Sequence, residues 1–219
     1  MTLSRSALRR IYDRVGRWQD TQSVYEAPAL EALVAHAPFD TTHALFELGC
    51  GTGRFAARLL RNHLPSSARY VGVDLSATMT RQARRRLAPF APRASVRHTD
   101  GGLRFPDPDD AFDGAVATYV LDLLPPDDIQ TVLAEFHRLL RPGSPLCLAG
   151  LTHGHTVVSR GTSMLWSAVH RVAPALVGGC RPLDTRPFLD ADDRWRVEHH
   201  CIVTGAGIPS EVIVARAHP

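Results

Sequence analysis

The chain has 219 residues, of which 44% are hydrophobic and 21% charged, and it carries a formal net charge of +3. This length suits one domain with a sizeable core, and the composition excludes a fibrous or largely disordered chain. The positive charge falls well short of that of a nucleic-acid-binding tail.

Residue usage sets an expectation for the cellular setting. All 25 residues in the Lys and Arg count are arginines, which we interpret as the codon usage of a GC-rich, bacterial genome. None of the four cysteines forms a CxxC pair, so zinc and disulfide frameworks lack support and a reducing cytoplasm is expected. Neither a signal-peptide core nor an uncharged apolar span occurs, so we expect no stable membrane insertion. The oligomeric state stays open.

Hydrophobic periodicity predicts two amphipathic helices first, over residues 4–18 and 24–36. Short apolar runs then alternate with helical patterns. Strands are predicted at 43–48, 69–74, 94–99, 112–118 and 146–151, and helices at 53–63, 76–87 and 127–140. This alternation predicts a parallel sheet with helices on both faces.

The last third of the chain departs from this rhythm. Residues 156–177 predict a helix broken near Pro174, and 178–193, rich in Pro, Gly and Asp, predict a loop. Two strands are expected at 195–204 and 211–217, around a five-residue turn. We interpret the chain as a single domain with four parts: a helical segment 1–40, a core 41–150, an insertion 151–194 and a hairpin 195–219.

A glycine-rich turn, Glu47–Gly53 (ELGCGTG), joins the first predicted strand to its helix. Glycine lets the backbone approach a ligand closely, and a helix N-terminus offers free N–H groups to an anion. A dinucleotide fingerprint requires another glycine where the chain has Arg54, which argues against NAD. Taken alone, the pattern favours a plain tight turn over a ligand site.

Carboxylates follow the next two predicted strands. Asp74 is suited to accept both ribose hydroxyls of a nucleoside, and its alternative is a helix cap. Asp100 is suited to accept from an adenine amine beside the N–H of Gly101, and its alternative is a turn. Because open α/β sheets bind ligands at the carboxyl ends of their strands, these features together predict a nucleoside site.

With these segments the chain resembles the class I S-adenosylmethionine-dependent methyltransferases from about Leu45 to Gly150. The resemblance implies a Rossmann-like α/β fold, with a seven-stranded mixed sheet of order 3-2-1-4-5-7-6, the last strand antiparallel and helices on both faces. The predicted C-terminal hairpin supplies the last two strands. The matching segments are Glu47–Gly53, Gly72–Ser76 with Met79, Asp100–Pro106, Phe112-Asp113 and Leu139–Gly143.

The resemblance also implies a role for each matching position toward S-adenosylmethionine, the expected methyl donor. Three parts of that molecule, namely its methionine end, its ribose and its adenine, would each have their own set of residues. These are Glu47, Gly49, Cys50, Gly51 and Gly53 at the methionine end, Asp74 at the ribose, Leu75 and Met79 beside the adenine, Asp100 and Gly101 at its edge, and Thr118 and Tyr119 beside the sulfonium and the acceptor.

The methyl transfer itself makes few demands on side chains. A sulfonium is already a good electrophile, so alignment and exclusion of water are the main tasks, and a general base is needed only for an acceptor that must lose a proton. The candidates are Tyr119, Asp122 and His153, with His155 beside the last. Asp122 suits a turn cap equally well. The two histidines lack an acidic third ligand, so no metal is expected.

Two further patterns bear on the acceptor. Thr118–Asp122 stands where nucleic-acid amino-methyltransferases carry an Asn/Asp-Pro-Pro-aromatic motif, so a small-molecule acceptor is expected and nucleic acid is not. Ile11–Arg14 followed by Trp18 is similar to the lid of quinone-biosynthesis and lipid-head-group methyltransferases, which favours an apolar, quinone- or lipid-like acceptor. A packing helix is the alternative. The apolar stretch Met164–Val177 suits an acceptor pocket or a membrane contact, and core packing is the more common outcome for such a stretch.

The main hypothesis is therefore a methyltransferase that moves a methyl group from S-adenosylmethionine to a small molecule by in-line displacement. One alternative is a nucleotide-dependent oxidoreductase of the NAD type. Others are a donor-binding module without catalysis, and a methyltransferase acting on RNA or protein.

Overall fold

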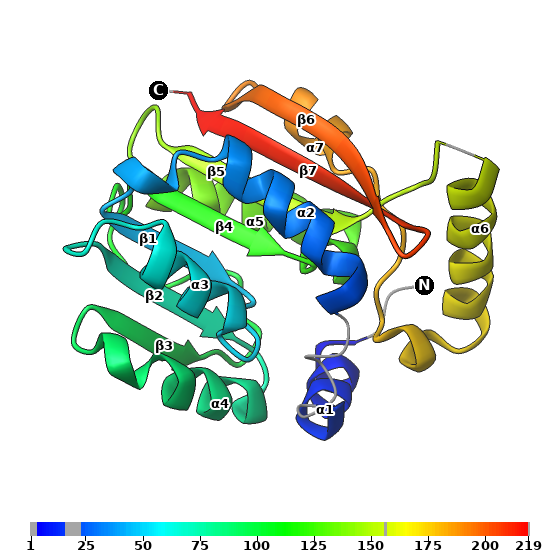
Figure 1. Cartoon of the computed structure of the whole chain (residues 1–219), viewed down its shortest axis with the longest axis horizontal. Coiled ribbons are helices and arrows are strands. Elements are labelled where there is room, and N and C mark those ends of the chain that lie inside the picture. The colour runs from blue at the N-terminus through cyan, green and yellow to red at the C-terminus, as the bar shows by residue number, and fades with distance from the viewer. Residues whose placement is uncertain (1–3, 16–22, 156, 219) are drawn as a thin grey trace.

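The computed structural model of the chain describes residues 4–15, 23–155 and 157–218. Its centre is a seven-stranded sheet of order β3-β2-β1-β4-β5-β7-β6, which confirms the predicted order (Figure 1). Strands β1 to β5 run parallel, and β7 lies antiparallel between β5 and β6. The strands are β1 Ala44–Leu48, β2 Arg69–Asp74, β3 Ala94–His98, β4 Gly114–Thr118, β5 Pro145–Leu151, β6 Trp195–Gly205 and β7 Ile208–Ala217.

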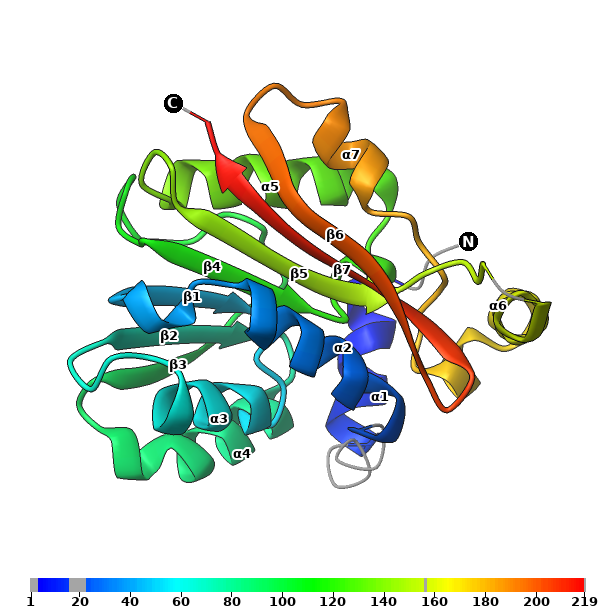
Figure 2. The same cartoon turned by 45° about the horizontal axis from the view of Figure 1, so that its top comes forward.

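Helices cover both faces of the sheet, as Figures 1 and 2 show. One face carries α2 (Ser23–His36), α3 (Arg54–Asn62) and α4 (Ala77–Leu87), and the other carries α5 (Pro126–Leu139) and α7 (Arg186–Asp190). Two more helices, α1 (Arg5–Val15) and α6 (Val157–Val172), lie beyond the end of the sheet at which the parallel strands finish. None of the described helices has the length and apolar character needed to cross a bilayer.

The core on the α5 side is built around Phe46 of the central strand β1. Its ring centroid lies 5.0 Å from that of Phe105, 5.2 Å from Phe112 and 6.2 Å from Phe136. All four rings are buried. Since β1 has neighbours on both edges, its residues face packed layers above and below, which explains the continuous apolar run of the sequence.

The C-terminal third differs from the sequence prediction in two places. The expected loop over 178–193 contains α7, a one-turn helix with Pro187 in its first turn, where a missing N–H costs no hydrogen bond, and with Leu189 buried. The expected five-residue turn has only two residues, Ala206 and Gly207, both with positive φ. Such a turn matches the twist of paired strands, so β6 and β7 extend further than predicted.

We expect Phe46→Ala to lower the free energy of unfolding by about 3–5 kcal/mol, because it removes the ring at the centre of this aromatic cluster. Urea denaturation followed by circular dichroism measures the loss. Val172→Ala, at a side chain that is 86% exposed, serves as the control and should change stability by less than about 0.5 kcal/mol. A loss below about 1 kcal/mol for Phe46→Ala would contradict this account of the core.

Candidate functional site

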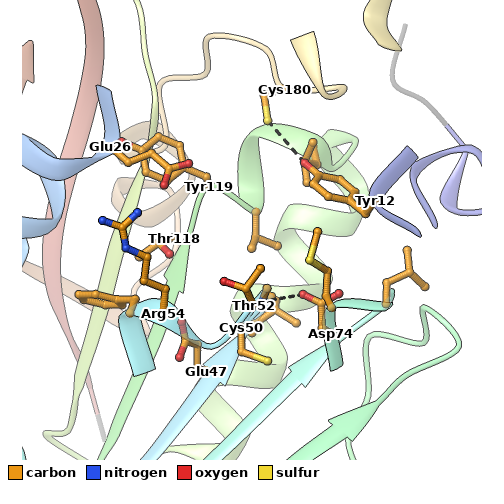
Figure 3. Close-up of a pocket in the computed structure, with 18 of the residues that line it drawn as sticks. Tyr12, Glu26, Glu47, Cys50, Thr52, Arg54, Asp74, Thr118, Tyr119 and Cys180 are labelled. Carbon is orange, nitrogen blue, oxygen red and sulfur yellow. Dashed lines mark hydrogen bonds between the residues drawn. The ribbon is translucent and has the colours of Figure 1, made fainter. Parts of the chain in front are cut away.

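A cavity of about 360 Å³ opens at the carboxyl ends of the parallel strands (Figure 3). Its walls come from α1, α2, the glycine loop, the ends of β2, β3 and β4, and the segment around Cys180. The volume lies in the range of small-molecule sites, and the position is where open α/β sheets bind ligands.

The glycine loop after β1 forms one wall of this cavity. Gly49, Gly51 and Gly53 all have positive φ, at 71°, 52° and 73°. A Cβ on Gly49 would collide with Val120, whereas one on Gly51 would meet no protein atom within 4 Å. Glycine at position 49 is thus required by packing, while at 51 it leaves a bare backbone facing open space. Gly53 does not line the cavity and instead lies against Ala83 of α4.

Asp74, at the end of β2, organises this loop and faces the cavity. Its Oδ2 accepts from the Gly51 N–H and its Oδ1 from the Ser76 N–H, both at 2.8 Å. Burial raises the pKa of Asp74, and these two hydrogen bonds partly oppose that rise. Ser76, whose hydroxyl accepts from the Met79 N–H, caps α4. A carboxylate has about four acceptor sites, so Asp74 keeps capacity for ligand hydroxyls.

Glu47 is a second acidic side chain in the cavity lining, and it is 1% exposed. The Tyr70 hydroxyl donates to its Oε2 at 2.5 Å. Burial, together with the negative charge of Asp74, raises the pKa of Glu47 to about 7, although the Tyr70 hydrogen bond acts in the opposite direction. A cationic ligand group beside Glu47 would favour the ionised carboxylate.

Tyr119 follows β4 with φ of 56°, which is uncommon for a residue with a side chain. Its N–H donates to the Ala149 carbonyl at 2.7 Å, and its hydroxyl lies 2.9 Å from the Ser210 Oγ. The centroid of its ring lies 5.8 Å from that of Tyr25, with the two rings in an edge-to-face arrangement. Burial raises the pKa of Tyr119 above its ordinary value, so the phenol stays protonated at neutral pH. It is therefore suited to donating a hydrogen bond rather than to accepting a proton.

Helix α1, which contains most of the predicted lid segment, is tied down at two points. The Ser76 hydroxyl donates to Asp13 at 2.6 Å, and the Thr78 N–H to the same carboxylate at 3.2 Å. The Tyr12 hydroxyl donates to the Gly178 carbonyl at 3.2 Å. Leu8 and Tyr12 line the cavity, so α1 forms part of its wall. Trp18, the last residue of the predicted lid, lies outside the described residues.

Several lining residues carried no recognisable signal in the sequence. Figure 3 shows Glu26, Tyr119 and Arg54 on one side of the cavity and Tyr12 on the other, with Cys180 above. Tyr119 is a predicted site residue and Tyr12 belongs to the predicted lid segment Ile11–Arg14. Glu26 and Cys180, by contrast, come from a helix and a loop whose sequence contains no indication of a site. Arg54, which stands where a dinucleotide fingerprint has a glycine, also lines the cavity.

Four predicted site residues lie outside the lining, namely Gly53, described above, and Asp100, Asp122 and His153. The Asp100 side chain is exposed, and its carboxylate accepts from the Gly102 N–H at 2.9 Å, while Gly101 and Gly102 themselves line the cavity. Asp122 is 1% exposed and accepts from the Leu151 N–H at 3.3 Å, facing a small void beside β5 and β7. His153 is exposed after β5. The cavity geometry gives no support for Asp122 or His153 as a base.

Comparison with known proteins identifies relatives that are methyltransferases. A family model described as "Methyltransferase domain" matches residues 45–143. The trans-aconitate 2-methyltransferase of Azoarcus sp. (strain BH72) is 36% identical over 135 residues, covering 60% of this chain and 49% of the relative. Methyltransferase GfsG of Streptomyces halstedii is 30% identical over 189 residues, covering 82% of this chain and 61% of the relative. This chain thus spans about half to three fifths of the length of these relatives.

Solved structures agree on the fold. An O-methyltransferase family protein from Burkholderia thailandensis superposes with a TM-score of 0.69, at 17% identity, over 94% of this chain and 58% of that one. A SAM-dependent methyltransferase from Methanosarcina mazei superposes with a TM-score of 0.62, at 18% identity, over 80% of this chain and 92% of that one.

The buried carboxyl of Asp122 generates a prediction about stability and pH. Burial raises its pKa to about 7 from 3.8, so the unfolded chain ionises it at a lower pH than the native state does. The protonated carboxyl therefore stabilises the fold fully below pH 3.8, and this contribution is lost as pH rises through about 7. We expect Asp122→Asn, which cannot ionise, to gain on the order of 4 kcal/mol relative to the wild type between about pH 4 and pH 7.5.

Urea denaturation across this pH range measures that difference. The exposed Asp193 supplies the control, because Asp193→Asn should follow the wild-type curve. A constant difference between Asp122→Asn and the wild type at every pH would show that the native carboxyl titrates normally.

Proposed function

Because the chain belongs to the class I S-adenosylmethionine-dependent methyltransferase family, we propose that it transfers a methyl group from S-adenosylmethionine to a small-molecule acceptor by in-line displacement. The observation that carries this proposal is the pairing of Asp74 with the glycine loop. A carboxylate fixed by two backbone N–H groups stands beside an open glycine backbone, both facing one cavity. This arrangement suits a nucleoside with its hydroxyls at Asp74.

The donor would lie along the carboxyl ends of β1 and β2. Asp74 would accept the ribose hydroxyls, with Leu75 and Met79 beside the adenine and the Gly101 backbone at its edge. Asp100 would act on this edge by holding the turn at Gly102. Glu47, Gly49, Cys50 and Gly51 would line the methionine end, and Thr118 and Tyr119 the sulfonium.

When bound, the donor supplies an electrophilic methyl group on its sulfonium, and the protein's task is to align the acceptor and exclude water. The remaining lining is largely apolar, with Leu8, Leu30, Leu123 and Leu124 among its members. This lining supports an apolar acceptor, quinone- or lipid-like. Helix α1 would act as a lid that completes this apolar lining.

Three tyrosines stand on this acceptor side, namely Tyr12, Tyr25 and Tyr119. Burial raises the pKa of all three. Their hydroxyls therefore position an acceptor by hydrogen bonding and do not deprotonate it at neutral pH. Within the proposed apolar class, an acceptor whose reacting atom needs no added base, such as a carboxylate oxygen on an apolar molecule, fits these side chains best.

The donor assignment is tested by calorimetry with S-adenosylhomocysteine. We expect Asp74→Ala to weaken binding by one to two orders of magnitude, on the order of 1–3 kcal/mol for hydrogen bonds lost in a buried site. Asp193→Ala, at an exposed carboxylate, is the matched control and should bind like the wild type. Binding of NADH in place of S-adenosylhomocysteine would overturn the proposal in favour of an oxidoreductase.

The acceptor class is tested by transfer of a labelled methyl group to a cell extract that is then separated by size. We expect label in small, organic-extractable molecules, because the cavity is compact and largely apolar. Label in RNA or protein would reassign the acceptor. Donor binding without transfer to any fraction would identify a non-catalytic donor-binding module.

A further inference from the structure

The outer face of α6 is the most apolar exposed surface of the described chain. Met164, Leu165 and Val172 are 72%, 67% and 86% exposed, and they are the large hydrophobic side chains that stand exposed among the described residues. All three belong to one helix, which stands apart from the sheet in Figure 1 and is seen nearly end-on in Figure 2. We define this outer face by its exposed residues Arg160, Met164, Leu165, Ala168, Arg171 and Val172.

The charged side chains of α6 are all basic. Arg160 stands near the start of α6 and Arg171 near its end, both exposed. The helix contains no acidic residue, and the sequence has no Asp or Glu at all between Glu135 and Asp184. The outer face therefore combines apolar side chains with two positively charged ones, a combination that suits an anionic, partly apolar surface.

The inner side of α6 is joined to the cavity wall. The Trp166 indole N–H donates to the Cys180 carbonyl at 2.9 Å. The Trp166 ring centroid lies 6.1 Å from that of Tyr25, and the two rings are arranged edge to face. Thr162 donates to the Gly207 carbonyl at 2.6 Å. Because Tyr25 and Cys180 both line the cavity, Trp166 connects α6 directly to the cavity wall.

We propose that α6 docks the protein on an anionic membrane surface, with its outer face in the headgroup region. Met164, Leu165 and Val172 would enter the boundary of the acyl chains, and Arg160 and Arg171 would meet the lipid phosphates while their aliphatic stems remain in apolar surroundings. A docked α6 holds the cavity beside the lipid. This docking goes beyond methyl transfer and does not require it.

The test is co-sedimentation of the full chain with phosphatidylcholine vesicles that contain or lack phosphatidylglycerol. We expect binding to the anionic vesicles only. Arg160→Gln with Arg171→Gln should weaken that binding about thirtyfold, from roughly 1 kcal/mol for each arginine near the surface. Met164→Glu with Leu165→Glu should abolish it, because acidic side chains would replace the inserted apolar ones.

The matched control is Arg81→Gln with Arg85→Gln, which removes the same charge from exposed positions on α4. It should bind within about twofold of the wild type, since the lost charges lie away from the docking face. Equal weakening by both arginine pairs would show attraction by net charge alone and overturn the proposal. Thermal melting of each variant confirms that the fold is retained.

A second copy of the chain is the competing occupant of this face. Sedimentation velocity in the absence of lipid distinguishes it. We expect the wild type and the Met164→Glu, Leu165→Glu variant to sediment as the same species. A wild-type dimer that this variant dissociates, or a wild type that fails to bind anionic vesicles, would overturn membrane docking.

Discussion

The pairing of β1 with β2 is the constraint on which the site depends. The parallel register sets Leu48 beside Val73, so the chain leaves β1 level with the end of β2. The N–H groups of Gly49 and Cys50 then donate to the Val73 carbonyl, and that of Gly51 to the Asp74 carboxylate. The glycine loop is thus held by main-chain and carboxylate contacts before any ligand enters.

The proposed acceptor side is built differently, since its parts meet only through tertiary packing. Tyr12 comes from α1, Tyr25 from α2 and Cys180 from a loop beyond α6, yet all three line one cavity. Asp13 fastens α1 to α4, and Trp166 fastens α6 to the loop at Cys180. The half of the cavity proposed to choose the acceptor is therefore assembled from the most widely separated segments.

Two acidic side chains are buried near the carboxyl ends of the parallel strands, and their desolvation disfavours the ionised form. Glu47 and Asp122 both have pKa values raised to about 7, chiefly by desolvation, and they face different voids. Glu47 faces the cavity, where a cationic ligand group would offset this desolvation. Asp122 faces a small void near Glu211, where its contribution to the fold depends on pH.

The sequence by itself determined the sheet and predicted the part of the cavity that we propose for the donor, because both rest on local signals. The strands and the glycine loop are marked by short stretches of consecutive residues, namely apolar runs, glycines at fixed spacing and Asp74 directly after a strand. The strand order was implied by the family resemblance that these residues carry. Only the tertiary structure decided that Tyr25 and Arg54 face the cavity and that Asp122 and His153 do not. The direction of a side chain after a strand depends on which distant segment packs against it. The hydrophobic periodicity of the sequence does not indicate such long-range contacts.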